Sequence, residues 1–310
     1  MIIANPIYDV VFKKIMLNLR VAKFFISTLL NEEVESIEVK PQEMLYERKD
    51  GEKLGWSILR LDYIATIKTE TGEYKKILIE IQKAQNLVDV MRFRKYLASQ
   101  YQTEDIINDE KMVLPITTIY ILGFNLPESD KACFCVKKNY IDLLDHEEMT
   151  NKIEFAENLT HDCYIIQAGR IKERFQTKLD KLLSVFEQRH FINEQQTIKE
   201  YRYQPDLPEL IELTNLLYHV GVDPEERKQL DIEQEAWRTM NAYMEEKDKI
   251  IKEKQLALEK KEMEIELQKI EIVAKDNALE ETNRLLAAIA KELKEKNELI
   301  ERLLKKAGES

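Results

Sequence analysis

Three polar side chains interrupt two apolar, strand-like runs. Asp62 lies in the run WSILRLDYIATIK, and Glu80 and Gln82 lie two residues apart in KKILIEIQ. The polar turn TETGEY separates the runs, so the sequence predicts a β-hairpin whose loop consists of residues 70–72, with Gly72 in the left-handed conformation. A loop of that length places Asp62 directly opposite Glu80, and alternation places Glu80 and Gln82 on one face.

Two facing carboxylates need a physical reason. Directly opposed residues have Cβ atoms roughly 4.5–5.5 Å apart, where like charges destabilise a sheet. A Mg²⁺ ion would remove the repulsion, because it prefers carboxylate, phosphate and water oxygens. Gln82 would then orient a water molecule or a phosphate oxygen. The pattern also fits a solvated strand face, with the carboxylates paired to Arg60, Lys76 or Lys83.

The flanking sequence predicts the elements that would hold this hairpin. A helix is expected from Asn5 as N-cap and Pro6 at the first helical position through VVFKKIMLNLRVAKFFISTLL. After the hairpin come a helix, VDVMRFRKYLASQYQTEDII, and a buried strand, PITTIYILGF, with shorter strands around ACFCVKKNYIDLL and DCYIIQAG. This order predicts a small mixed α/β domain.

The second half of the chain is predicted to be mainly helical. Helix is expected from Arg170 to about Gln204, with Pro205 and Pro208 breaking it before a further helical segment from Leu210. Between Pro224 and Gly308 there is neither Gly nor Pro, so that stretch should be almost wholly helical. We therefore expect a core domain at 1–175, a helical extension at 176–243 and a coiled-coil tail at 244–310.

Four segments carry a family resemblance. They are NPIYDVVFKKIM, with Asp9, Phe12 and Lys13 in a D-x-x-F-K pattern; LRLDYIATIKTETGEYKKILIEIQ, with Asp62 and the E-x-Q motif at 80–82; RFRKYLASQYQ, with Arg92 and Tyr96; and PITTIYILGF. In order and spacing they resemble the PD-(D/E)XK nuclease family transposases, the group that includes the recombination-promoting nucleases. The resemblance covers about residues 4–125.

The resemblance implies a restriction-endonuclease-like mixed sheet flanked by helices and a Mg²⁺-dependent (or Mn²⁺-dependent) DNA endonuclease associated with recombination or transposition. Asp62, Glu80 and the carbonyl of Ile81 would bind the metal. Gln82 and Asp9 would complete the catalytic set, although an acidic residue in a helix's first turn also stabilises the helix dipole. The residues expected to contact DNA are Arg92, Arg94, Lys95, Tyr96, Lys83 and Lys13.

The chain departs from the family's name at two positions. No proline precedes Asp62, and Gln82 stands where the motif has lysine. The second departure removes a cation expected to activate water or to stabilise charge on the phosphate. Lys76 and Lys83 are the candidate substitutes, although alternation points Lys83 to the opposite face of the strand.

Three cysteines and a histidine form a second motif. Cys133 and Cys135, with His161 and Cys163, contain the ligand types of a zinc site, but two residues or more normally separate paired zinc-binding cysteines. We interpret them as ordinary core residues, since free cysteine is commonly buried.

The tail repeats an apolar residue every seven positions, which is typical of a coiled coil. The repeat consists of Ile251, Leu258, Ile265, Ile272, Leu279, Leu286, Leu293 and Ile300. We expect a homodimer, because a helix this long cannot bury its stripe alone. The open alternatives are a tail that folds back on the helical region or one that is partly disordered.

Bulk properties limit the function classes. The formal net charge of −11 argues against a generally basic nucleic-acid binder but leaves room for a local basic groove. No apolar run is long enough for a membrane span, no signal-peptide pattern is present, and three cysteines do not make a disulfide framework. We expect a cytoplasmic protein. The rival to the nuclease is a catalytically silent DNA- or protein-binding module assembled through its coiled coil.

Overall fold

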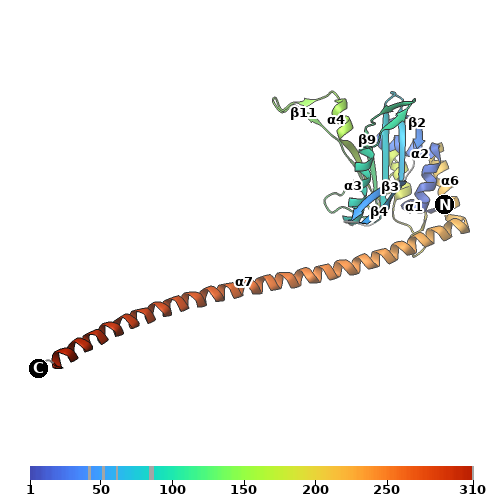
Figure 1. Cartoon of the computed structure of the whole chain (residues 1–310). Helices are drawn as coiled ribbons and strands as arrows, with labels where there is room; N and C mark the ends of the chain where they lie inside the picture. The colour runs from blue at the N-terminus through green and yellow to red at the C-terminus, as the bar shows by residue number, and fades with distance from the viewer. Residues whose placement is uncertain (41–42, 51–52, 61, 84–86, 309–310) are drawn as a thin grey trace. The chain divides into compact units, whose positions relative to one another are not determined.

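The computed structural model describes residues 1–40, 43–50, 53–60, 62–83 and 87–308. It confirms the mixed α/β class, with a six-stranded mixed sheet, helices on its faces and a long C-terminal helix (Figure 1). The contacts divide the chain into two compact units, Met1–Thr239 and Met240–Ser310.

The sheet has the strand order β10-β13-β9-β6-β5-β2. Strand β9 runs parallel to both β6 and β13, and the other neighbours are antiparallel. The bounds of the strands are β2, Val34–Val39; β5, Tyr63–Thr69; β6, Tyr74–Gln82; β9, Ile116–Leu122; β10, Cys133–Val136; and β13, His161–Gln167.

The hairpin of β5 and β6 has the predicted register. Tyr63 pairs with Ile79 and Lys68 with Tyr74, and the amide of Thr69 donates to the carbonyl of Glu73 at 2.9 Å. Gly72 has φ +88°, a conformation that other residues rarely adopt, so this glycine allows the tight loop at 70–72. The run predicted as one strand from Trp56 is divided at Asp62, because its first part pairs elsewhere as β4.

Helices α1 (Asp9–Leu17), α2 (Leu19–Leu30) and α6 (Pro208–Val222) pack with one face of the sheet around a large apolar core. Gly221 allows α6 to approach strand β1 (Ile2–Ala4), since a Cβ there would lie 3.0 Å from the amide nitrogen of Ala4. Helix α3 (Leu87–Tyr101) lies on the other side of the sheet, where Phe93 and Tyr96 join a second core cluster with Leu78 (Figure 1).

Short elements complete the first unit. They are β3, Glu43–Asp50; β4, Lys53–Arg60; β7, Asp105–Ile107; β8, Glu110–Met112; β11, Tyr140–Ile141; β12, Glu148–Met149; α4, Glu154–Leu159; α5, Lys178–Leu183; and β14, Ile198–Glu200, with 3₁₀ turns at Ala168–Arg170 and Ser184–Phe186. Strand β14 pairs antiparallel with β1.

Two predictions about helices are wrong. The first helix begins at Asp9 rather than after Asn5, because the Asn5 amide instead donates to the Gln188 side chain and the Gln196 carbonyl. The stretch 170–204 contains only the short helix α5, a 3₁₀ turn and β14 instead of one long helix.

The expected division at residue 175 does not separate two compact units. The main core joins residues on both sides of it, from Ile3 to Leu230, so the expected helical extension packs within the first unit.

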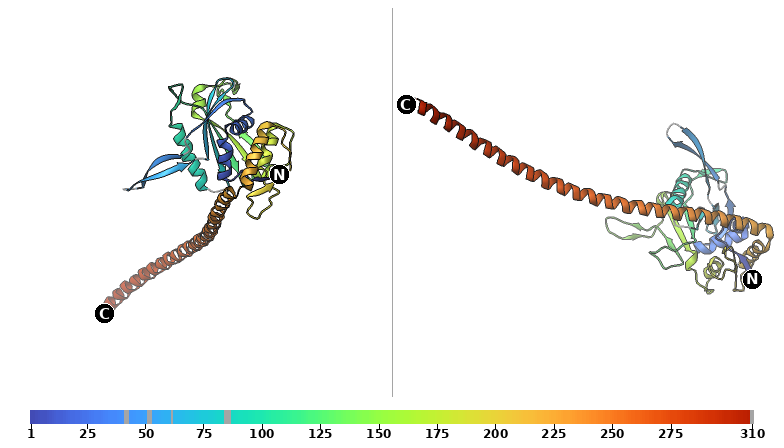
Figure 2. Two further views of the ribbon diagram at one scale, coloured as in Figure 1. Left: turned by 90° about the vertical axis from the view of Figure 1, so that its right-hand side faces the viewer. Right: turned by 90° about the horizontal axis from the view of Figure 1, so that it is seen from below.

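Helix α7 (Pro224–Gly308) confirms the long C-terminal helix, and both views in Figure 2 draw it as one continuous helix. Its side chains from Ile250 to Arg302 are exposed in the single chain. Among the described residues, no helix is both long enough and apolar enough to cross a membrane.

Candidate functional site

Asp62 lies at the end of the hairpin, one residue before β5, and closes the ladder with its side chain. Its Oδ2 accepts a hydrogen bond of 2.6 Å from the amide of Ile81 on β6. The N–H and C=O of one strand residue point to the same side, so the Ile81 carbonyl also points toward the Asp62 side of β6. A carboxylate and a carbonyl are thereby directed to one place, as a hard cation requires.

Glu80 is buried in the middle of the sheet, with a relative exposure of 2%. Leu78, two residues before Glu80 and on the same face of β6, packs in the second core cluster under α3, whereas Ile79 packs in the main core on the opposite face. Glu80 therefore lies on the α3 face of the sheet. The Arg92 guanidinium of α3 donates to Glu80 Oε1 at 2.5 Å. This ion pair is one way in which the buried charge of Glu80 is compensated.

The two carboxyl groups affect one another. Burial raises the pKa of Asp62 well above its usual value, and the nearby charge of Glu80 raises it further. The Ile81 hydrogen bond opposes this rise, and Asp9 adds a smaller repulsion. The charges of Asp62, Glu80 and Asp9 therefore disfavour one another at this end of the sheet, and a bound cation would relieve that cost.

Asp9 reaches the site from the first turn of α1. Its Oδ2 accepts from the Lys13 ammonium one turn later, at 2.5 Å, while its Oδ1 is buried with no hydrogen-bond partner among the described residues. Both expectations for Asp9 therefore stay open: it stabilises the helix start, and it contributes negative charge beside Asp62.

The cap of α1 comes from a residue that the sequence analysis missed. Glu233, in the first turns of α7, accepts from the amides of Asp9 and Val10 at 2.9 and 3.0 Å. Glu233 Oε1 also pairs with the Lys83 ammonium at 2.5 Å. No local pattern marks Glu233, because its partners lie more than 140 residues away in the sequence.

Lys83 lies on the opposite face from Glu80, as alternation predicts. Its ammonium lies 3.7 Å from the centre of the Tyr8 ring and pairs with Glu233. Burial lowers the pKa of Lys83, and Glu233 opposes that shift, with smaller contributions from Asp9 and Asp62. Lys83 is thus close enough to the carboxylates to interact with them electrostatically.

Lys76, the other substitute considered for the motif lysine, is held elsewhere. It forms a buried ion pair of 2.7 Å with Asp105 of β7, toward the hairpin loop rather than at the Asp62 end of the strand. Arg60 was a third candidate partner for the carboxylates, but its side chain is not among those that the structure describes.

Gln82 presents an unused donor on the same face as Glu80. It is buried, and its Nε2 has no partner in the described part of the chain. A buried amide without a partner requires an explanation, and a water molecule or a ligand oxygen would supply one. This geometry suits the predicted role of Gln82 toward water or phosphate.

The predicted DNA-contacting residues of α3 divide into two kinds. Arg92, Arg94 and Lys95 are exposed, whereas Tyr96 is 1% exposed and packs with Leu78 and Phe93. Tyr96 therefore supports the helix from inside and has no surface from which to touch DNA. Burial, and then the charge of Glu80, raise the pKa of Tyr96 to about 12, so it stays protonated.

A preformed cluster of several metal ligands is not present in the described residues, where no three His, Cys, Asp or Glu side chains are grouped to hold an ion. The interpretation of the cysteines as core residues is wrong for Cys135, which is exposed, whereas Cys133 and Cys163 are half-buried in neighbouring strands. His161 instead forms a 2.9 Å hydrogen bond with the Tyr101 hydroxyl.

Comparisons with protein-family models, curated proteins and solved structures found no match. The chemistry of the site is therefore inferred from its own residues. The buried acid Glu80, the half-buried acid Asp62, the Ile81 carbonyl and the Gln82 amide lie where β5 begins and β6 ends, with exposed arginines on the adjacent helix. Such a set suits a hard cation beside a phosphate better than it suits an apolar ligand.

Proposed function

We propose that this chain is a Mg²⁺-dependent DNA endonuclease that hydrolyses phosphodiester bonds and acts in DNA recombination or transposition in the cytoplasm. The observation that carries the proposal is that Asp62, one residue before β5, lies close enough to Glu80 of β6 for the Glu80 charge, together with burial, to raise the pKa of Asp62. A sheet pays for such a pair in stability, and a cation-binding role accounts for it.

Each residue then has a defined part. Asp62, Glu80 and the Ile81 carbonyl would hold the ion, which when bound supplies a Lewis acid that polarises a phosphoryl oxygen and activates water. The Gln82 side-chain amide donates a hydrogen bond to that water or to a phosphate oxygen. Asp9 adds negative charge that favours a bound cation.

DNA would be held from α3. Arg94 and Lys95 are exposed and suited to phosphate contacts, and Arg92 can exchange its Glu80 partner for a phosphate when the ion neutralises Glu80. This exchange supplies a cation near the scissile phosphate in a chain whose motif lysine is replaced by Gln82.

The tail would join two such units. The heptad residues of α7 are exposed in the single chain, and pairing with a second copy would bury them. Two catalytic units in one dimer are suited to cutting both strands of a duplex.

The decisive experiment is nicking of supercoiled plasmid with Mg²⁺, Mn²⁺ or EDTA. Wild type is compared with Asp62→Asn and Glu80→Gln, and Glu73→Gln at the loop end of the same hairpin is the matched control. We expect metal-dependent nicking that each site variant lowers by about 100-fold or more and the control leaves intact, since removing one charge-stabilising group typically costs that much. Inactive wild-type protein, or variants that cut equally well, would remove the nuclease proposal.

A specific observation favours the rival, a catalytically silent binding module. Arg92 already compensates Glu80, and the Ile81 hydrogen bond gives Asp62 a structural task. Calorimetry separates the two functions, because a silent module has no need of the ion. Absence of Mg²⁺ and Mn²⁺ binding, together with DNA or protein binding by the wild type, would establish the rival.

A further inference from the structure

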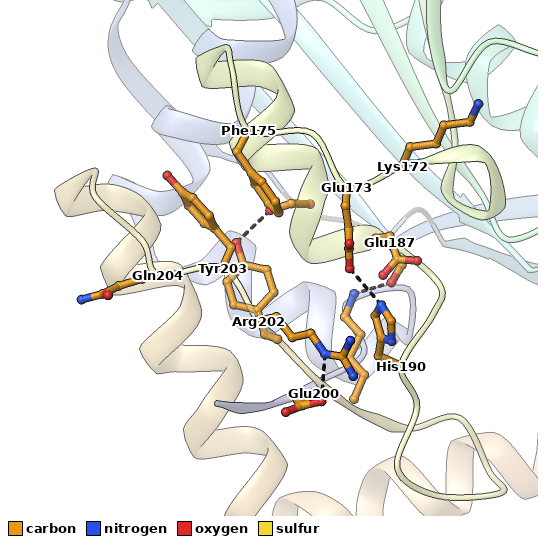
Figure 3. Close-up of a pocket in the computed structure, with 12 residues that line it drawn as sticks. Lys172, Glu173, Phe175, Glu187, His190, Glu200, Arg202, Tyr203 and Gln204 are labelled. Carbon is orange, nitrogen blue, oxygen red and sulfur yellow. Dashed lines mark hydrogen bonds and ion pairs between the residues drawn. The ribbon is translucent and has the colours of Figure 1, made fainter.

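A cavity lined by residues far in sequence from the carboxylates opens between β14 and the loop that precedes α5. Its volume is about 350 Å³, and none of its lining residues belongs to the Asp62 and Glu80 site. In Figure 3 the rings of Phe175 and Tyr203 lie on one side of the cavity, and the Glu173–His190 pair lies on the other. A cavity of this size suits a small organic molecule.

The cavity contains a buried lysine. Lys199, at the centre of β14, is 1% exposed, and its ammonium donates to the backbone carbonyl of Glu187. In the described part of the chain no carboxylate oxygen lies within ion-pair distance of Lys199. An ammonium has three donor hydrogens, and one neutral carbonyl compensates little of its buried charge.

The acids around the cavity already have cationic partners. Glu173 accepts from His190 at 2.9 Å, Glu200 accepts from Arg202 at 3.0 Å, and the Glu187 carboxylate pairs with Arg189. Lys199 is therefore a buried cation without a carboxylate of its own at ion-pair distance in the described part of the chain, although the Glu187 charge acts on it from farther away.

The opposite wall is aromatic. The Phe175 and Tyr203 rings are stacked, with centroids 4.2 Å apart and planes within 6°. Tyr201 meets Tyr203 edge-on at 6.3 Å. Stacked and edge-on rings form a flat, apolar surface that suits a further planar ring.

We propose that this cavity is a second binding site, which takes a small aromatic anion with its charged group against Lys199 and its ring against Phe175 and Tyr203. Binding would give the buried ammonium the anionic partner that the fold does not provide. The site is independent of the proposed nuclease function, so neither proposal depends on the other.

The proposal predicts a particular dependence on pH. Burial lowers the pKa of Lys199 to about 7, and Glu187 and Arg189 modify it in opposite directions. A bound anion raises that pKa again, so binding takes up a proton when the pH is above about 7 and affinity falls by up to about tenfold per pH unit there.

The other charged groups around the cavity are Lys172, Glu173, His190, Glu200 and Arg202. Strand β1 places apolar Ile3 opposite Lys199, and the Met1 amino group donates to the Tyr201 carbonyl.

Titration calorimetry of the full chain tests the proposal with three probes: benzoate, benzamide as the same ring without charge, and acetate as the charge without the ring. We expect benzoate to bind at least about tenfold more tightly than either of the others. Lys199→Met should weaken benzoate at least about tenfold, whereas Lys131→Met, an exposed lysine outside the cavity, should not.

The wild type alone provides a second test if Lys199→Met fails to fold. Benzoate titrations at about pH 8 in buffers of different ionisation enthalpy should show proton uptake, and those at about pH 6 much less. The proposal is overturned if benzamide binds as well as benzoate, if benzoate does not bind, or if its binding takes up no proton above pH 7.

Discussion

The two units of this molecule treat charge in opposite ways. In residues 1–239, Lys76, Glu80 and Lys199 are almost fully buried, and each has a specific polar partner from a distant part of the sequence or from another element. In residues 240–310 the ion pairs are exposed and join residues three or four apart on one helix, as in Lys275 with Glu271. Exposed pairs of this kind contribute only about 0.3–0.5 kcal/mol each. Charges in the tail thus keep a long helix solvated, whereas burying Lys76, Glu80 and Lys199 lowers the stability of the first unit through their lost hydration.

The apolar residues show the reverse contrast. The first unit buries its aliphatic side chains in two clusters, but the tail leaves its heptad residues as exposed as their neighbours. Ile272 is 58% exposed and Val273 is 59% exposed. The two positions would differ in exposure only if a second helix covered the heptad face and buried Ile272. The tail would then have a buried apolar core of its own, as the first unit does.

The largest effect is therefore expected at a heptad position. Ile272→Asp should abolish dimerisation, costing more than about 5 kcal/mol per dimer, because it buries an unpaired carboxylate from each chain in the seam. Sedimentation velocity measures the mass. The control Val273→Asp changes a residue of equal exposure outside the repeat and should leave the dimer intact. A wild-type monomer at micromolar concentration, or equal effects of the two substitutions, would contradict the dimer.

A smaller effect is expected at Glu233, which acts wholly within the first unit. Glu233→Ala should lower the free energy of unfolding by about 3 kcal/mol, because it leaves Lys83 buried without its partner and uncaps α1. Urea denaturation monitored by circular dichroism measures this change. Glu226→Ala breaks the more exposed pair with Lys14 and should cost less than about 1 kcal/mol. Equal costs would mean that the Glu233 cluster is as well solvated as a surface pair.

How far the sequence predicts this molecule depends on the range of the interactions. The hairpin register follows from a period of two and from Gly72, both local, and the structure confirms it. The long tail helix follows from the absence of Gly and Pro, which is local too. The Glu233 cap on α1 is not local, and it replaces the expected Asn5 cap.

The same reasoning explains the candidate site. Pattern and resemblance identified Asp62, Glu80 and Gln82 as one group, and the ladder places Glu80 and Gln82 in β6 beside Asp62. They did not predict that Tyr96 is buried, that Lys83 pairs with Glu233 or that Lys199 occupies a cavity. Burial of one polar side chain depends on which distant elements cover it, and periodicity within the helix or strand does not report that.

The smallest effect is expected at Asp62, and its sign separates a functional carboxylate from a structural one. Without metal, the raised folded-state pKa of Asp62 lowers the stability of the protein at pH values above the unfolded-state pKa, and this cost is lost as pH falls from the folded-state pKa to the unfolded-state one. Asp62→Asn removes the charge and keeps an oxygen for the Ile81 amide. It should therefore stabilise the metal-free protein at pH 7 by on the order of 1 kcal/mol, with the gain vanishing in acid. Urea denaturation in EDTA at several pH values measures it. In Mg²⁺ the order should reverse, because only the wild type gains binding free energy from the ion. A variant less stable than wild type in EDTA would make Asp62 a structural residue, held for its bond to Ile81 rather than for a cation.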